Sequence, residues 1–222
     1  MKRIGLYLLL LVAVAILSSC SKTEKNYYPD GNLQSTIHYR MGKESGKSVY
    51  YYDNPNTVEI EVEMKHGKRN GEFSRYFENG YLDTRCHYVN DSIEGVETMF
   101  TANGVKSQEF TYEHGKKNGP HKAYHLTGDL KIEGGFKNDH FDGPWKYYDE
   151  RGVLVGEGEF KDGTGEVTFY DPRGMVLRTT QYRNDKKNGK EIYYSSTGNI
   201  YKEIVFKDDR IVSEKMDSTK MN

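Results

Sequence analysis

The chain of 222 residues lacks the short motifs by which many enzymes are recognised. It contains no His-Glu-x-x-His, no Gly-x-Ser-x-Gly, no phosphate-binding loop and no closely spaced pair of cysteines. His121 and His125 have a spacing that suits a metal on a helix, but on a strand it separates the side chains by about 13 Å. We therefore expect no catalytic, metal or cofactor site, and we interpret the protein as a non-enzyme.

An excess of charge of one sign is also absent. The formal net charge is −1, from 32 Lys and Arg residues against 33 Asp and Glu residues. Without a basic stripe, a nucleic-acid partner is not expected. Charged residues (29%) and aromatic residues (13%) are both plentiful, which favours a thin folded structure over a disordered chain.

Only one long apolar run is present, from Ile4 to Leu17. Its 14 residues are too few to span a bilayer, which needs about 20. Lys2 and Arg3 precede the run, and the small residues Ser18 and Ser19 follow it. A basic start, a short apolar stretch and small residues indicate an export signal.

The ending Leu17-Ser18-Ser19-Cys20 resembles a bacterial lipobox, in which the cysteine is lipidated and becomes the mature N-terminus. The resemblance implies a lipoprotein signal peptide over residues 1–19, lipidation of Cys20, and a lipidated N-terminus and short tether over residues 20–26. Several acyl chains, each CH₂ contributing about 0.8 kcal/mol, would anchor the protein stably to a membrane. The alternative is an ordinary secretory signal in which Cys20 is incidental.

The same resemblance predicts a location in the cell envelope. Ser21, rather than Asp, follows Cys20, and by similarity to enterobacterial sorting this favours the outer membrane over the inner membrane. A lipidated Cys20 would leave Cys86 as the one remaining thiol, so no intramolecular disulfide could form. We interpret Cys86 as a small buried hydrophobe.

Glycine is abundant and periodic. A glycine recurs about every 24 residues, and an aromatic residue always follows it five positions later. Self-similarity at such a period indicates a repeat array. The glycines are Gly46, Gly71, Gly95, Gly119, Gly143, Gly165 and Gly189, and the aromatic residues are Tyr51, Tyr76, Phe100, Tyr124, Tyr148, Tyr170 and Tyr194.

Each repeat is predicted to form a β-hairpin. A second glycine, as in Asn79-Gly80, follows the aromatic residue by four positions and is typical of a turn. The residues after that turn alternate, with Thr84, Cys86 and Tyr88 on one apolar face, which indicates a half-buried strand. A turn rich in Lys, Asn and Gly, such as residues 66–71, leads to a strand expected to start at the repeat glycine.

We therefore predict an all-β fold, an elongated single antiparallel sheet of about seven tandem β-hairpins and about fifteen strands. The repeat array is expected over residues 27–207. Residues 208–222 are polar and contain no repeat glycine, so we expect a C-terminal cap or tail there.

The repeated pattern Tyr-x-x-x-Gly-x-Leu, followed by Phe/Tyr-x-x-Gly-x-x-x-Gly-x-x-x-x-Tyr, resembles bacterial MORN-variant repeats. The clearest copy runs from Tyr124 to Tyr148. The resemblance implies hairpins in an elongated sheet that serve as interaction or scaffold modules. Some members carry an antitoxin-component label, which is hard to reconcile with an exported lipoprotein. The departures are Pro55 at a turn glycine, Met64 at a strand-end aromatic position, and a shortened turn at residues 162–164.

Two classes of function remain open. The first is a membrane-anchored envelope lipoprotein that acts as a protein-interaction or structural scaffold, with a protein partner of unknown identity. The second is a cell-surface glycan-binding module, in which ring faces stack on sugars. Trp145 is the one tryptophan, and most aromatic residues are expected at inward positions, so the first class is favoured. The pattern assigns no ligand-binding residue.

Overall fold

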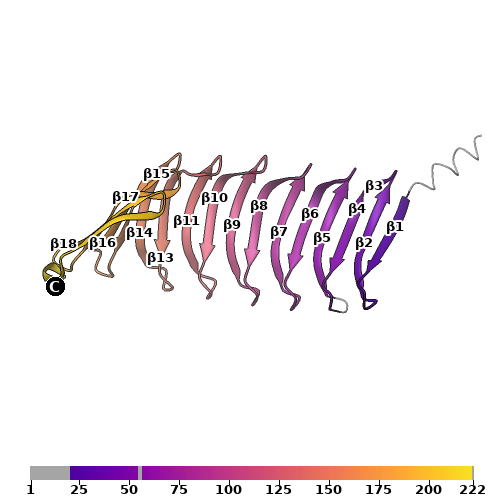
Figure 1. The fold of residues 1–222 in the computed structure, drawn as a ribbon, viewed down its shortest axis with the longest axis horizontal. Helices are drawn as coiled ribbons and strands as arrows, with labels where there is room; N and C mark the ends of the chain where they lie inside the picture. The colour runs from indigo at the N-terminus through magenta and orange to yellow at the C-terminus, as the bar shows by residue number, and fades with distance from the viewer. Residues whose placement is uncertain (1–20, 55–56, 222) are drawn as a thin grey trace, which may run out of the picture. The chain divides into compact units, whose positions relative to one another are not determined.

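The computed structural model describes residues 21–54 and 57–221 (Figure 1). Nineteen strands belong to one open antiparallel sheet, and the described residues include no α-helix, only the 3-10 helix η1 (Ser218–Lys220). The predicted all-β fold of tandem hairpins is confirmed, with more strands than the fifteen or so expected. Within the described ranges no helix is long and apolar enough to cross a membrane. Cys20 and the predicted signal peptide over residues 1–19 lie outside those ranges.

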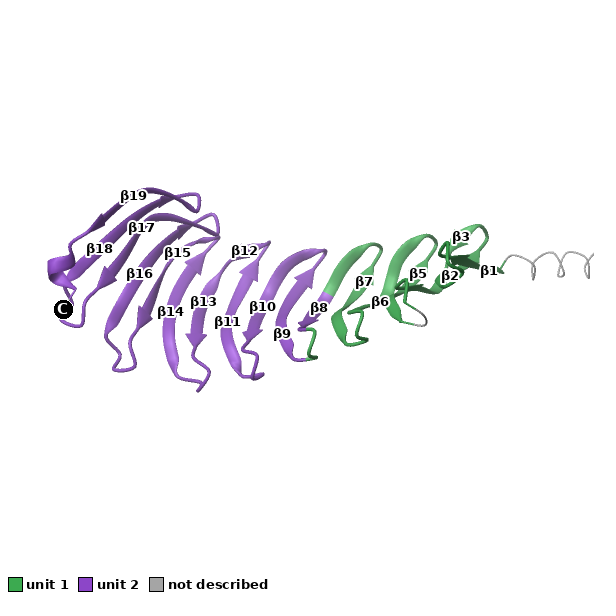
Figure 2. Cartoon of the chain, turned by 60° about the horizontal axis from the view of Figure 1, so that its bottom comes forward, with its two compact units in different colours: residues 1–94, 102–104 green, residues 95–101, 105–222 purple. Residues whose placement is uncertain are grey.

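The chain divides into two compact units (Figure 2). Unit 1 comprises residues 1–94 and 102–104, and unit 2 comprises residues 95–101 and 105–222. Unit 1 contains β1 (Ser21–Tyr27), β2 (Leu33–Arg40), β3 (Lys43–Glu44), β4 (Gly46–Tyr51), β5 (Val58–Lys65), β6 (Lys68–Tyr76) and β7 (Leu82–Val89).

Strand β8 (Ser92–Phe100) starts in unit 1 and ends in unit 2. The other strands of unit 2 are β9 (Lys106–Glu113), β10 (Lys116–Tyr124), β11 (Leu130–Lys137), β12 (His140–Phe141), β13 (Gly143–Tyr148), β14 (Leu154–Lys161), β15 (Thr164–Tyr170), β16 (Val176–Arg183), β17 (Lys186–Tyr194), β18 (Ile200–Lys207) and β19 (Arg210–Met216).

Two-residue turns close one end of the hairpins. Both turn residues have positive φ, for example +54° at His66 and +82° at Gly67, which is the signature of a type I′ turn. The turn expected over residues 66–71 is therefore only two residues long, and Lys68–Asn70 belong to β6. The same turn geometry occurs at Met41-Gly42, His66-Gly67, Asn90-Asp91, His114-Gly115, Asn138-Asp139, Asp162-Gly163, Asn184-Asp185 and Asp208-Asp209.

The repeat glycine lies at the start of β4 and β13, as expected, but inside the strand in β6, β8, β10, β15 and β17. In the β5–β6 pair, Val62 faces Phe73 and Met64 faces Arg69, so three residues of β6, with Gly71 at their centre, lie opposite Glu63. This is a β-bulge, and Gly71 has a φ of +130° there. Glycine adopts such a φ without steric cost, and the side chain of Glu63 occupies the space that a Cβ would need.

The shortened hairpin lacks this bulge. Strands β14 and β15 pair without a register shift from Gly156 opposite Phe169 to Lys161 opposite Thr164. The two residues missing from this repeat are therefore those that form the bulge elsewhere. Removing an even number of residues leaves the alternation of the remaining side chains intact, which explains why the deletion is tolerated.

Both ends of the predicted array need correction. The tether expected over residues 20–26 is largely strand, because β1 begins at Ser21 and pairs with β2. The polar cap or tail expected over residues 208–222 contains a further strand, β19, which pairs with β18 although all of its residues are exposed. The unpaired backbone groups at a sheet edge accept another strand whatever its side chains, so polarity alone did not reveal these strands.

One face of each unit holds the buried side chains. Thr84, Cys86 and Tyr88 are buried in unit 1, which confirms the predicted alternation of β7 and the buried position of Cys86. In unit 2, Trp145, Phe160 and Val167 form a hydrophobic core. Partly buried apolar residues pack against that core: Ile132, Phe136, Phe141, Tyr147, Phe169 and Tyr182.

Candidate functional site

A second, smaller bulge follows the glycine loop of each repeat. In the β13–β14 pair, Tyr148 faces Leu154 and Tyr147 faces Gly156, so Val155 has no partner across the strands. The equivalent unpaired residue is polar or charged in the first five strand pairs and apolar in the last three. In chain order these residues are Gln34, Glu59, Asp83, Ser107, Lys131, Val155, Leu177 and Tyr201.

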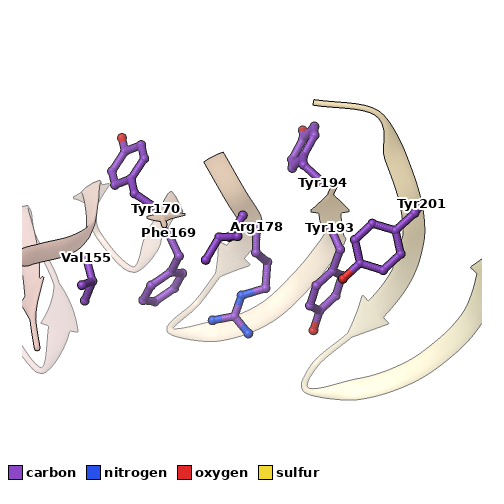
Figure 3. A pocket seen from close by; sticks show the side chains of 8 residues that line it. Val155, Phe169, Tyr170, Arg178, Tyr193, Tyr194 and Tyr201 are labelled. Carbon is purple, nitrogen blue, oxygen red and sulfur yellow. The ribbon is translucent and has the colours of Figure 1, made fainter. Parts of the chain in front are cut away.

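The three apolar bulge residues line one cleft in unit 2 (Figure 3). Its volume is about 430 Å³. Figure 3 shows Phe169, Arg178 and Tyr193 extending to one side of the strands, whereas Tyr170 and Tyr194 extend to the other. The complete lining is Val155, Phe169, Tyr170, Leu177, Arg178, Tyr193, Tyr194 and Tyr201.

Arg178 lies between aromatic rings in this cleft. It faces Phe169 on β15 and Tyr193 on β17 directly across the strands. Its Cζ atom is 4.5 Å from the centroid of the Phe169 ring and 5.9 Å from that of Tyr193, within range of cation–π attraction. On the next strand, Lys202 faces Tyr193, but its Nζ atom also pairs with Glu214 at 2.7 Å. The strand register therefore holds the guanidinium against the rings.

A buried carboxylate lies next to Arg178. Glu191 is only 2% exposed, and one of its oxygens, Oε2, accepts bonds from Lys187 Nζ at 2.7 Å and Thr180 Oγ1 at 3.0 Å. The other oxygen, Oε1, accepts the Tyr193 hydroxyl at 2.6 Å, and the nearest Arg178 nitrogen is 3.8 Å from Oε2. Glu191 thus contacts four donor groups on two strands, β16 and β17.

These hydrogen bonds favour the ionised form of the Glu191 carboxyl group. Burial alone would raise the pKa of Glu191, but the bonds from Lys187, Tyr193 and Thr180 outweigh it and hold the pKa below its usual 4.5. Burial and the Glu191 bond raise the pKa of Tyr193 by more than the neighbouring Arg178 guanidinium lowers it, so its hydroxyl remains a donor. At neutral pH one negative charge on Glu191 therefore faces two cations, and Lys187 is the closer of them.

The histidines singled out by the sequence have structural contacts. The His121 ring is 6% exposed and stacks on Phe110 at a centroid distance of 4.4 Å, and burial lowers its pKa. The Nε2 atom of His125 lies 2.9 Å from the carbonyl oxygen of Tyr148. Among the described residues there is no group of three or more His, Cys, Asp or Glu side chains that could hold a metal ion. The lipidation site Cys20 lies outside the described ranges and stays a prediction.

The aromatic residues divide into two sets. Strand-end residues such as Phe136, Phe160 and Tyr182 belong to or contact the core, as expected. Tyrosines five positions after the repeat glycine instead donate their hydroxyls to glutamates of the neighbouring strand. These bonds join Tyr76 to Glu61, Tyr124 to Glu109, Tyr148 to Glu133 and Tyr170 to Glu157.

Comparison with known protein families identifies the repeats. The model for the MORN repeat variant matches residues 22–41, 69–90, 141–162, 164–184 and 187–208. The chain carries MORN-variant repeats. Each match covers an adjacent pair of strands joined through a glycine loop, such as β6 with β7. The predicted MORN-variant repeats are confirmed, and the first match, over residues 22–41, includes most of the predicted tether. The MORN-variant repeats form an all-β scaffold.

Comparison with individual proteins adds little. No curated protein matches the chain. A chain of the solved structure titled "Crystal Structure of TcdB2-TccC3-Cdc42" is similar over 89% of this chain, with 11% identity and a TM-score of 0.24. The match covers 13% of that chain's own length.

The cleft was not predicted from the sequence, although the repeats carry a signal for it. The bulge residue stands three positions after the glycine of the loop, as Asp83 does after Gly80 and Leu177 after Gly174. Aligning the repeats at that glycine shows the change from polar to apolar residues in the last three copies. Arg178 follows Leu177 directly, so the same alignment would have found it.

Proposed function

We propose that the MORN-variant protein is a lipid-anchored, non-catalytic scaffold of the cell envelope that binds a protein partner at the cleft around Arg178. The observation that carries this proposal is the run of three apolar bulge residues, Val155, Leu177 and Tyr201, which line one cleft together. Neighbouring tyrosine and arginine side chains in a desolvated pocket are the residues most often found at the energetic centre of protein interfaces.

A protein partner suits the cleft better than a glycan. The residues that line the cleft include the aliphatic Val155 and Leu177, and Leu177 is 45% exposed. The hydroxyl of Tyr193, which could bond a sugar, is already bound to Glu191. The Tyr–Glu bonds of the other repeats likewise occupy hydroxyls that a glycan would need.

The anchoring part of the proposal rests on the lipobox resemblance. Lipidation of Cys20 would retain the protein on a membrane, with the outer membrane favoured by Ser21. Cell fractionation of a Cys20→Ala variant should move the protein from the membrane to the soluble fraction. A variant that stays in the membrane fraction contradicts the lipid anchor.

Photocrosslinking in cells tests the partner site. A photoreactive residue at Leu177 in the full-length protein should crosslink to one specific protein. The matched control places the same residue at Lys131, which occupies the equivalent bulge and is also exposed. Equal crosslinking from both positions, or none from Leu177, would refute a protein site at the cleft. Retention of the protein on peptidoglycan or surface polysaccharide, lost in a Leu177→Lys variant, would favour a glycan instead.

A further inference from the structure

We infer that the cleft binds an extended peptide that presents apolar side chains three residues apart and a carboxylate beside the middle one. This inference rests on the proposed function, because it names the kind of protein segment that the same cleft accepts. It is carried by the charge that Arg178 leaves unbalanced and by the spacing of the three apolar bulge residues.

Arg178 carries a positive charge that Glu191 does not fully balance. The Oε2 atom of Glu191 is 2.7 Å from Lys187 but 3.8 Å from the nearest Arg178 nitrogen, and its Oε1 atom accepts the Tyr193 hydroxyl. Lys187 therefore neutralises most of the Glu191 charge. Lys202, the other cation that faces Tyr193, is paired with Glu214. The guanidinium of Arg178 thus retains positive charge and donor capacity toward the cleft, because it has five N–H donors.

The Arg178 charge lies in an aromatic environment. Phe169 and Tyr193 flank the guanidinium, and the Arg178 side chain is 30% exposed. A charge held among aromatic rings is less screened by water than one on an open surface. An arginine in such a setting pairs well with a carboxylate, because its planar fork donates two parallel hydrogen bonds. An anionic group on the partner therefore complements the cleft.

The three apolar bulge residues are regularly spaced across the sheet. Val155, Leu177 and Tyr201 lie on β14, β16 and β18, which are alternate strands of the sheet. Alternate strands are about 9.6 Å apart. A peptide in the polyproline II conformation repeats its side-chain direction every three residues, or about every 9.3 Å. Such a peptide, crossing the strands, would place every third side chain against one apolar bulge residue.

The same geometry indicates where the carboxylate of the peptide should lie. Arg178 directly follows Leu177, the middle bulge residue, and lies on the same strand. The acidic residue of the peptide should therefore neighbour the side chain that contacts Leu177. An apolar residue every third position with Asp or Glu beside the central one defines the expected ligand class.

Peptide binding to the purified full chain tests this inference. The probe is the fluorescent nonapeptide PLPPLEPLP, measured by polarisation, with PLPPLQPLP as its uncharged counterpart. We expect the charged peptide to bind about tenfold more tightly, because a charge-assisted bond contributes about 1.4 kcal/mol. Arg178→Gln should abolish this difference, so that both peptides bind the variant equally. The control Arg173→Gln, at an exposed arginine paired with Asp171 in a nearby turn, should preserve it.

Thermal unfolding and a second variant complete the test. Thermal unfolding of Arg178→Gln and Leu177→Ser shows whether each variant folds, and Leu177→Ser, which adds no charge, should weaken both peptides without changing their ratio. Equal binding of the two peptides to the wild-type protein, or no binding of either, overturns the inference. A protein crosslinked at Leu177 whose contact segment lacks a carboxylate overturns the inference but leaves the proposed function standing.

Discussion

The two units share one backbone design but fill it with different side chains. The position two residues after the repeat glycine holds Ser48 and Phe73 in unit 1, and Glu97, His121, Trp145, Val167 and Glu191 in unit 2. The turns and bulges require glycine and other residues that tolerate positive φ, but they leave the inward side chain free to change. A repeat built in this way can keep its fold while one unit acquires a core of aromatic side chains.

The difference in side chains implies a difference in stability. In unit 2 the Trp145 and Phe160 rings lie 6.1 Å apart and each is at most 5% exposed. Large rings bury about 150–250 Å², and burial contributes about 25 cal/mol per Å². The buried residues of unit 1 include the small side chains of Ser35, Ser48 and Thr84. Since repeat arrays unfold by units, unit 1 should open before unit 2.

The largest expected effect comes from removing the tryptophan of unit 2. Trp145→Ala should lower the free energy of unfolding by about 3–5 kcal/mol, because it leaves a cavity against Phe160 and Phe141. Ser48→Ala, at the equivalent position of unit 1, should cost less than about 1 kcal/mol, because the buried Ser48 hydroxyl has no hydrogen-bond partner to lose. Urea unfolding combined with hydrogen exchange of each unit measures both changes. Equal losses of unfolding free energy in the two variants would mean that the aromatic core contributes nothing to the stability of unit 2.

Replacing a glycine in a bulge tests the backbone geometry that both units share. Gly119 has a φ of +128° in its bulge, and an added Cβ would lie 3.1 Å from the Thr111 side chain, so Gly119→Ala should destabilise by about 1–3 kcal/mol. Gly71→Ala should cause at least as large a loss in unit 1, because Gly71 has a φ of +130° and an added Cβ would clash with the Glu63 side chain. Gly152→Ala, in a loop with open space around it, should cost only about 1 kcal/mol. Thermal unfolding of the three variants ranks them, and a costlier Gly152→Ala would contradict the bulge explanation.

Local patterns in the sequence were enough to predict the hairpins. Asn79-Gly80 and the alternation of Thr84, Cys86 and Tyr88 specify a turn and a half-buried strand without knowledge of the partner strand. The bulge around Gly71 could not be predicted in the same way, because it depends on which residues of β5 face β6. Lys68–Asn70 have the composition of a turn, and only the pairing of the backbone makes them strand.

The cleft was not predicted from the sequence either, because it depends on the pairing of the strands. Strict alternation places Leu177 and Arg178 on opposite faces of a strand, yet both line the cleft. The one-residue bulge that breaks the alternation is a property of the β15–β16 register. The buried position of Glu191 could not be expected either, because an isolated glutamate favours solvent. Its burial depends on Lys187, Thr180 and Tyr193, which the folded sheet brings to it.

The smallest expected effect is the pH dependence of stability that His121 causes. It is tested by giving unit 2 the residue found at the equivalent position of unit 1. Burial lowers the pKa of His121 below its usual 6.5, so below pH 6.5 the unfolded chain binds more protons than the folded one. The stability that the neutral ring contributes is therefore complete above pH 6.5 and is lost as the pH falls through the folded pKa, by at most about 1.4 kcal/mol per pH unit.

His121→Phe gives unit 2 the residue that unit 1 has at Phe73, and it should remove this loss while keeping the stack on Phe110. Urea unfolding from pH 7.5 down to about 5 compares the two proteins. The other histidines are present in both, so the difference between the two curves isolates His121. Parallel curves would show that His121 protonates as readily in the folded protein as in the unfolded chain, and that burial in the aromatic stack of unit 2 does not set its charge.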